Sequence, residues 1–295
     1  MVSLLFATLL AWYFSRPIYI LRSAFEAAAG GKLETRIGTA MGRRKDELAD
    51  LGSDFDRMAE RLQNLLETQQ RLLHDVSHEL RSPLARMQAA TGLMCQQPER
   101  NAEFVEHIER DTARMDKLIG ELLALARLDA GMTDRLDETV DLGEITTEIT
   151  DGARLEAEMR RCTIAVDLNS PGLTQGSHEL LYRAIENVVR NAIRYSPIGG
   201  IVEISTQLAT GQFRLTVADQ GPGVPDGDLA AIFDPFFRCR TGQPNGYGLG
   251  LAISRSVVEA HGGKIFAENR PEAGLLVTLE LPCSSRKTSR PNQDF

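Results

Sequence analysis

The most constraining feature of this sequence is a heptad spacing of apolar residues that recurs in two consecutive stretches. The first stretch begins near Asp46 and ends at Pro98, and the second covers about residues 102–128. Apolar residues stand seven apart in both, at Leu73, Leu80 and Met87, at Ile108, Met115 and Leu122, and at Leu118 and Leu125. This spacing predicts two long helices joined by a short connection, which form a helical hairpin. Two apolar seams per helix predict that the hairpin dimerises into a four-helix bundle.

The N-terminal residues predict a contact with a membrane. Residues 1–14, "MVSLLFATLLAWYF", carry no charge and precede Arg16 and Arg22. At ~1.5 Å per residue they span about 21 Å, less than the roughly 30 Å hydrocarbon core. A secretory signal would carry its positive charge before the apolar run. We therefore expect the cytoplasmic end of a transmembrane helix, from a fragment of a longer protein or from a misplaced start codon.

Between the apolar end and the hairpin, residues 15–67 predict two helices joined by a glycine-containing link. The first helix is expected over residues 17–29, and the link contains "GGKLETRIG". The second helix carries apolar residues at intervals of three and four, at Leu48, Leu51, Phe55, Met58 and Leu62. Since no strong breaker follows before Pro83, this helix should continue into the hairpin, residues 68–131.

After a polar linker at about residues 129–140, the pattern becomes that of a mixed α/β domain, residues 138–283. Five runs rich in β-branched residues predict strands: "TIAVDL", "IVEISTQL", "FRLTVAD", "KIFAEN" and "LLVTLEL". Helices are expected between them at about 141–160, 178–195 and 248–261. The polar tail, residues 284–295, is expected to be disordered.

The net charge and the cysteines bear on three possibilities: a nucleic-acid partner, a disulfide framework and a cysteine zinc site. The net charge is −8, which gives no indication of a nucleic-acid partner. The four cysteines, Cys95, Cys162, Cys239 and Cys283, form no C-x-x-C pair. Their scatter argues against a disulfide framework and against a cysteine zinc site.

The stretch "LLHDVSHELRSPL" places His74 and His78 four residues apart on one helix face. The string H-D-x-x-H in this stretch differs from the zinc signature H-E-x-x-H only in that Asp is one methylene shorter than Glu. A metal site, a phosphorylation site and an ordinary helix face are therefore the alternatives. A zinc site needs a third ligand, and the remaining histidines lie in no downstream signature. If zinc were bound, it would bind stoichiometrically and His74→Ala would abolish activity.

Three clusters in the α/β domain carry potential chemistry. In "ENVVRNAIRYS", Asn187 and Asn191 share a helix face, and two amide oxygens there suit a hard cation beside phosphates, although a pair of exposed asparagines is the plainer interpretation. "DQGPGVP" follows a strand, and its acid, Asp219, can accept a hydrogen bond from an exocyclic amine such as that of adenine. "GYGLGL" precedes a helix, where glycines can cradle phosphate, but it does not match the dinucleotide fingerprint G-x-G-x-x-G.

Together, in this order, these stretches resemble the sensor histidine kinases of two-component systems. "SHELRSPL" is similar to the H box, "ENVVRNAIRYS" to the N box, "DQGPGVP" to the G1 box, "IFDPFFR" to the F box and "GYGLGL" to the G2 box. Residues 15–67 resemble a HAMP signal-relay module, with Pro17 and Glu47 at its marker positions. Within the family, "RLLHDVSHELRSPL" and "NVVRNAIRYS" resemble the Cpx-type envelope-stress sensors. The resemblance implies an α-helical bundle followed by an α/β sandwich of the GHKL (Bergerat) ATPase type.

The resemblance also implies site residues. His78 would be the phosphoacceptor, Glu79 would take its proton, and Ser82 would stand where members with phosphatase activity often carry Thr. The implied nucleotide-binding residues are Asn187, Asn191, Arg194, Tyr195, Asp219, Gly221, Gly223, Arg238, Gly246, Gly248, Leu249 and Gly250. Asn191 and Asn187 would hold Mg²⁺ beside ATP, and a lid would span about residues 238–245. Tyr247 departs from the family, which usually has a small residue there, so lid closure or nucleotide affinity is expected to differ.

The implied partners are a response-regulator receiver domain, a second copy of the chain through the hairpin, and the membrane through the N-terminal segment. The implied place is the bacterial inner (plasma) membrane, with the catalytic part facing the cytoplasm. Two other classes stay open. An ATPase of the chaperone or gyrase type would have a glutamate at position 187 and no H box, and a non-catalytic scaffold would be expected to have lost nucleotide-contacting residues.

Overall fold

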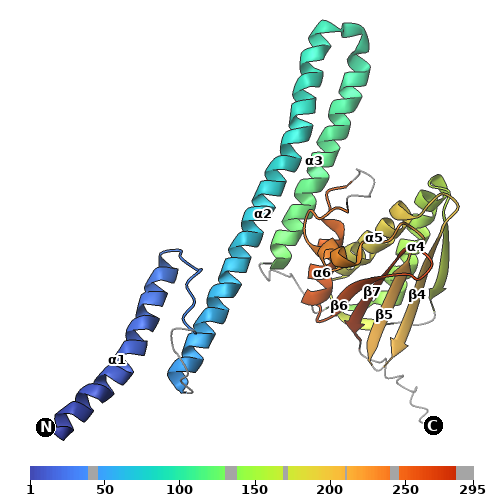
Figure 1. The fold of residues 1–295 in the computed structure, drawn as a ribbon. Coiled ribbons are helices and arrows are strands. Elements are labelled where there is room, and N and C mark those ends of the chain that lie inside the picture. The colour runs from blue at the N-terminus through green and yellow to red at the C-terminus, as the bar shows by residue number, and fades with distance from the viewer. Residues whose placement is uncertain (39–45, 130–137, 169–171, 210, 240–245, 284–295) are drawn as a thin grey trace, which may run out of the picture. The chain divides into compact units, whose positions relative to one another are not determined.

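The computed structural model describes residues 1–38, 46–129, 138–168, 172–209, 211–239 and 246–283 (Figure 1). The chain divides into two compact units, residues 1–78 and 79–295, and helix α2 runs from one into the other. The long helices are α1 (Val2–Ala29), α2 (Glu47–Gln96) and α3 (Asn101–Asp129). The predicted tail, and residues 130–137 of the predicted linker, lie outside the described residues.

Helix α1 is one continuous helix of 28 residues with Pro17 in its interior. The expectation of a separate helix beginning at Pro17 was therefore wrong. Proline is costly inside a helix, but apolar and helix-forming residues on both sides continue the helix past it. Residues Ser3–Ala29 are long and apolar enough to cross a membrane by length and composition, with a mean hydropathy of 1.4. Such a helix on its own is weak evidence of a span.

The C-terminal half of α1 packs against the first part of α2. The buried apolar side chains of this contact are Leu21, Ala24, Ile37, Phe55 and Ala59. Phe25 meets Phe55 edge to face, with ring centroids 4.8 Å apart. Asp56 fixes the extended connection, because its two carboxylate oxygens accept the backbone N–H groups of Ile37 and Gly38, each at 2.8 Å. The expected link and second helix are thus confirmed for the described residues, while the expected first helix is the C-terminal part of α1.

Helices α2 and α3 form the predicted hairpin. Helix α2 continues through Pro83 and ends at Gln96, and the short 3-10 helix η1 (Pro98–Arg100) makes the turn. The seam residues Leu118 and Leu125 are buried, at 0% and 4% exposure, on a helix that also packs against α6 (Gly250–Ala260). Other apolar side chains along the two helices stay exposed, among them Leu84, Leu93, Val105, Ile119 and Leu123. One predicted seam is therefore buried, while further apolar surface of the two helices stays uncovered.

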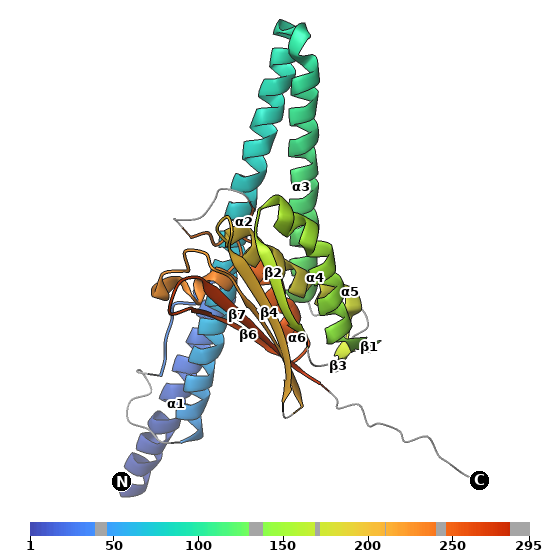
Figure 2. The same cartoon turned by 90° about the vertical axis from the view of Figure 1, so that its right-hand side faces the viewer.

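The α/β domain has one five-stranded sheet in the order β2-β4-β5-β7-β6 (Figure 2). Its strands are β2 (Thr163–Leu168), β4 (Ile201–Ala209), β5 (Gln212–Ala218), β6 (Lys264–Asn269) and β7 (Leu275–Pro282). β2 pairs parallel with β4, and the other neighbours pair antiparallel. Helices α4 (Leu142–Met159), α5 (His178–Tyr195) and α6 (Gly250–Ala260) cover one face. All five predicted strands and all three predicted helices are confirmed.

Residue alternation explains why only one face of the sheet is covered. In β5, Phe213, Leu215 and Val217 are buried against the helices, while Gln212 before them and Arg214 between the first two face solvent. On that open face Arg214 pairs with Glu280 of β7 at 2.6 Å. The result is a two-layer α/β sandwich, as expected. A small second sheet of β1 (Glu138–Asp141) and β3 (Leu173–Gly176) was not predicted.

Candidate functional site

His78 lies on α2 with an exposed side chain, and His74 one turn earlier is exposed as well. Glu79 is partly buried. Among the described residues no group of three His, Cys, Asp or Glu side chains is arranged to hold a metal ion. The histidine pair therefore has no third ligand within the part of the chain that the structure describes, and His74 is an exposed residue of α2.

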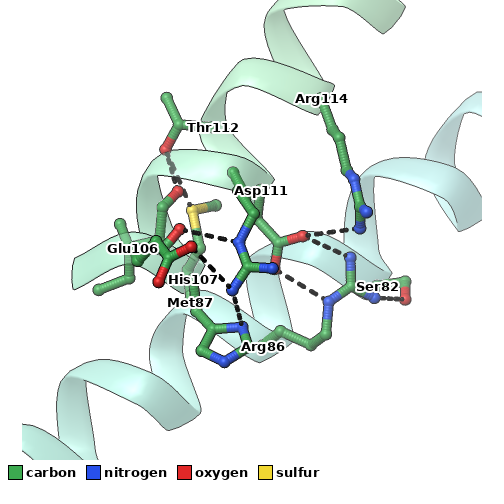
Figure 3. A network of polar contacts seen from close by, with 10 residues as sticks. Ser82, Arg86, Met87, Glu106, His107, Asp111, Thr112 and Arg114 are labelled. Atoms are coloured by element: carbon green, nitrogen blue, oxygen red, sulfur yellow. Dashed lines mark hydrogen bonds and ion pairs between the residues drawn. The ribbon is translucent and has the colours of Figure 1, made fainter. Parts of the chain in front are cut away.

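Ser82 takes part in a polar network that joins α2 to α3 (Figure 3). Arg86 Nη1 donates to Ser82 Oγ at 2.8 Å. The same guanidinium donates from Nε and Nη2 to the two carboxylate oxygens of Asp111, at 2.9 and 2.8 Å. Arg114 lies 3.7 Å from Asp111. The hydrogen bond from Arg86 lowers the pKa of Asp111 despite its burial, so the carboxylate is charged.

Helix α5 presents the asparagines of the second motif. Its apolar stripe packs on the sheet and includes Leu181, Ile185 and Val188, which leaves Asn187 and Asn191 beside the start of α6 and partly buried. Asn187 Nδ2 donates to the carbonyl of Gly250 at 3.2 Å. Because the amide nitrogen is used in this bond, Oδ1 is the atom left to accept from a ligand or coordinate a cation.

Arg194, one turn after Asn191, lies directly against Gly246. A methyl group on Gly246 would overlap the Arg194 guanidinium, and this glycine has φ +121°. Burial lowers the pKa of Arg194, and repulsion by Arg160 and Arg238 lowers it further. Arg194 Nε is buried and has no hydrogen-bond partner among the described residues. Three cations close together with an unpaired N–H make an environment suited to the phosphates of a nucleotide.

Asp219 ends β5 and is buried at 4% exposure. Its Oδ1 accepts the backbone N–H groups of Gly221 at 2.8 Å and Leu275 at 3.1 Å. Burial raises the pKa of this carboxyl, and the two N–H bonds oppose the rise. Gly221 is required here, since a methyl group on it would lie 2.6 Å from the carbonyl oxygen of Tyr195. The first glycine motif therefore approaches the end of helix α5 closely through its backbone.

The F-box and G2-box segments are joined to each other. Phe236 N–H donates to the carbonyl of Gly248 at 3.0 Å, and Phe236 has φ +62°. Gly248 has φ +74°, and a methyl group on it would lie 2.5 Å from the carbonyl oxygen of Phe237. Leu249 is buried at 1% exposure. Arg238 and Gly246 are exposed, and residues 240–245 of the predicted lid lie outside the described residues.

Two supporting residues, Asn269 and Gly274, are absent from the sequence-based prediction, whereas Gly223 is part of it. Gly223 has φ +70° and packs on Asn269, whose amide accepts from Val224 N–H at 2.9 Å and donates to its carbonyl. Gly274 has φ +106°, and a methyl group there would overlap the carbonyl of Asp219. The stretch "NRPEAGLL", a turn between two predicted strands, is the signal that could have directed attention to them.

Three family models match the chain in succession. Residues 9–64 match the HAMP domain, and residues 68–131 match the His Kinase A (phospho-acceptor) domain. Residues 176–285 match the histidine kinase-, DNA gyrase B- and HSP90-like ATPase family. His78 and Ser82 fall in the second match, while Asp219 and the glycines of the G2 segment fall in the third.

Curated relatives and solved structures agree with these matches. The sensor histidine kinase CpxA of Escherichia coli is 34% identical over 94% of this chain, and the sensor protein CutS of Streptomyces coelicolor is 36% identical over 90%. The chain spans 60% of the length of the former and 65% of the latter. The histidine kinase ThkA, solved in complex with the response regulator protein TrrA, has a TM-score of 0.58 at 24% identity over 76% of this chain and 64% of that one. This likeness shows the fold.

Proposed function

Because the chain belongs to the sensor histidine kinases of two-component systems, we propose that it moves the γ-phosphoryl group of ATP to His78 and then to an aspartate of a response regulator. The observation that carries the proposal is the exposed position of His78 on α2, within the segment that matches phospho-acceptor domains. An imidazole that acts as a nucleophile must be reachable by the phosphoryl donor.

ATP is the proposed substrate of the α/β domain. Asp219 would accept a hydrogen bond from the adenine amine, because its Oδ1 is held in place by two backbone N–H groups. Arg194, which is partly buried and whose buried Nε has no partner among the described residues, would pair with phosphate oxygens, and the exposed Arg238 would add charge. The first N–H groups of α6, which begins at Gly250, can donate hydrogen bonds to an anion in the same way.

Mg²⁺ is the proposed metal, and the residues fit it. Asn187 has its nitrogen bonded to Gly250 and its oxygen available, and Asn191 follows one turn later on α5. Amide oxygens are hard ligands of the kind that Mg²⁺ accepts alongside phosphate oxygens and water. When bound, the ion would neutralise charge on the phosphates.

The proposed chemistry has two transfers. A neutral nitrogen of His78 attacks the γ-phosphorus, the bond to the β–γ bridging oxygen breaks, and ADP leaves. Glu79, next to His78 and partly buried, takes the imidazole proton. A carboxylate oxygen of the regulator then attacks the phosphorus, the P–N bond breaks, and His78 is restored by a proton.

Hydrolysis of the regulator's phosphoaspartate is proposed as a weaker second activity. Ser82 follows His78 by four residues in α2, a spacing that places both on one helix face. Its hydroxyl can orient water, as the threonine of related enzymes is expected to do. Ser82→Ala and Ser82→Thr, compared with the parent on phosphorylated regulator, test this: the rate should fall in the first and be kept in the second. Equal rates in all three proteins would exclude the role.

The homodimer and the membrane anchor are part of the same proposal. The uncovered apolar side chains of the hairpin, such as Ile119 at 44% and Leu123 at 54% exposure, support burial against a second copy. The apolar length of α1 supports insertion in the bacterial plasma membrane, with the later domains on the cytoplasmic side.

One experiment separates the proposed kinase from the two other classes. The full chain in detergent is incubated with Mg²⁺ and γ-labelled ATP, and label on protein is measured together with released phosphate. Label on the chain that passes to a receiver domain supports the kinase. Phosphate release without labelled protein would indicate an ATPase, and neither signal would indicate a scaffold.

A further inference from the structure

The hydroxyl of Ser82 is held differently from other hydroxyls on the hairpin. Thr91 Oγ1 donates to the carbonyl of Met87 at 2.8 Å, and Thr112 Oγ1 donates to the carbonyl of Ile108 at 2.8 Å. Each of these hydroxyl groups donates its hydrogen to a backbone carbonyl one turn earlier in the same helix. Ser82 instead accepts from Arg86, and it donates to no partner among the described residues. Its hydrogen and one lone pair therefore stay available on an exposed surface.

Arg86 is itself fixed from the other helix. Two of its nitrogens form a fork with the carboxylate of Asp111, whose side chain is 9% exposed, whereas the side chain of Arg86 is 53% exposed. Such two-point pairs define the plane of the guanidinium. The third nitrogen can then reach Ser82 in only a narrow range of directions (Figure 3). The buried carboxylate on α3 thereby determines how a hydroxyl on α2 is oriented.

We propose that Arg86, anchored by Asp111, is a positioning residue for the dephosphorylation reaction, and that it acts by orienting the Ser82 hydroxyl toward the attacking water. The proposal rests on the phosphatase activity proposed above. In that reaction water attacks the phosphorus of the regulator's phosphoaspartate, the P–O bond to the aspartyl oxygen breaks, and aspartate and inorganic phosphate result. The proton of the water leaves to solvent or phosphate. Arg86 itself need not touch the reacting atoms.

The test is a double-mutant cycle on the full chain. Receiver domains are screened by transfer of label from the phosphorylated chain, and the one labelled fastest is the substrate. Its dephosphorylation is followed with the parent, Ser82→Ala, Arg86→Ala and the double variant. Arg110→Ala is the matched control, because Arg110 lies on α3 in an exposed ion pair with Glu106 at 3.8 Å.

Arg86→Ala is expected to lower kcat about tenfold with little change in KM, the scale of one hydrogen bond from a charged donor. In the Ser82→Ala background the same substitution should have no further effect, and Arg110→Ala should match the parent. Arg114, 3.7 Å from Asp111, stays as a cation beside the carboxylate, which limits the structural cost of removing Arg86.

Three outcomes would overturn the inference. An equal loss in both backgrounds would mean that Arg86 supports the hairpin and does not act through Ser82. An unchanged rate in Arg86→Ala would exclude any role. A parent that does not accelerate loss of label from the receiver would refute the phosphatase part of the proposed function instead, and the inference with it.

A second pair of variants covers the case in which Arg86→Ala fails to fold. Asp111→Asn keeps Arg86 but weakens its anchor, and Arg86→Lys keeps a charged donor without the fork. Both are expected to reduce kcat by less than Arg86→Ala would, and both losses should disappear in the Ser82→Ala background. Losses that persist there would again contradict the inference.

Discussion

The hairpin and the α/β domain build their candidate sites in different ways. On the hairpin, exposed side chains on one helix carry the chemistry, and a side-chain network from the other helix holds one of them. In the α/β domain, close backbone contacts at Gly221 and Gly248 shape the site, and the key acid, Asp219, is buried. The site on the hairpin should tolerate small shifts of the backbone, whereas the site in the α/β domain should not.

The difference follows from what each region does in the proposed reaction. A phosphoacceptor has to meet two partners, a nucleotide and a receiver domain, so an accessible helix surface serves it. A nucleotide site has to exclude other ligands. It also has to bring the backbone near the phosphates, which requires glycines at positive φ. Substitutions of glycine by alanine should therefore have opposite effects in the two regions.

The largest effect is expected from Gly248→Ala. At φ +74° and 2.5 Å from the Phe237 carbonyl oxygen, an added methyl group would break the junction of the F-box and G2-box segments. Strain of this kind costs on the order of 1–3 kcal/mol. We expect phosphorylation of the chain to fall by more than about tenfold, the factor that ~1.4 kcal/mol represents, measured as the initial rate of label incorporation. Gly227→Ala is the control, since Gly227 has nothing within 4 Å of the added atom. Equal losses in the two variants would refute the account of this junction.

Asp219→Asn should have the next largest effect. An amide oxygen can still accept from Gly221 and Leu275, so the fold should be kept, but the charged acceptor is lost. One hydrogen bond to a charged group is worth roughly 1.5–3 kcal/mol, so ATP affinity should fall about ten- to a hundredfold. Calorimetric titration with a non-hydrolysable ATP analogue measures it, and Asp151→Asn on the exposed surface of α4 is the control. An unchanged dissociation constant would remove Asp219 from the site.

Gly92→Ala on the hairpin should be stabilising. Gly92 lies inside α2, and an added methyl group would meet nothing within 4 Å. Alanine is favoured over glycine in a helix by about 0.5–1 kcal/mol. A higher midpoint is expected in thermal unfolding followed by far-UV circular dichroism. A lower midpoint would mean that this helix surface is closely packed against another chain.

The smallest effect concerns His261, buried between α6 and the start of α5. Its Nδ1 bonds the Val257 carbonyl at 2.7 Å, and its Nε2 accepts the Ser177 N–H at 3.1 Å, so the ring is neutral. Burial lowers the pKa of His261 from 6.5. The unfolded chain then binds the proton more readily, so the stabilising contribution is complete above pH 6.5 and is lost as the pH falls below it. Urea midpoints at neutral and acidic pH should differ less in His261→Gln, and the same difference in both proteins would contradict this assignment.

The sequence predicted much of the fold because its periodic patterns are long. Helix α5 was expected over residues 178–195 and occupies His178–Tyr195, and "TIAVDL" and "KIFAEN" coincide with strands β2 and β6. Strands β1 and β3 have four residues each, too few for an alternation to be recognised. Pro17 misled the prediction because a proline suggests a helix start, while its neighbours favour an uninterrupted helix.

The sequence named many candidate site residues. It did not indicate the contacts that depend on how distant segments pack together. Motifs singled out the asparagines, Asp219 and the glycines, because residues of these types occur there in recognisable short patterns. Arg86 and Asp111 could not be found in this way. They are charged residues 25 positions apart on two helices, and only the register of the hairpin brings them together. For Leu249 the ligand contact suggested by its place in the G2 motif stays a prediction, and the structure adds that this residue is buried.

The most direct test of the central claim is the position of the label. The full chain, His78→Gln and His74→Gln are incubated with Mg²⁺ and γ-labelled ATP, and the stability of the protein label is followed in acid and in alkali. The account predicts an acid-labile, alkali-stable label that disappears only in His78→Gln. A label that survives in His78→Gln, or one lost equally in His74→Gln, would contradict the assignment of His78 as the phosphoacceptor.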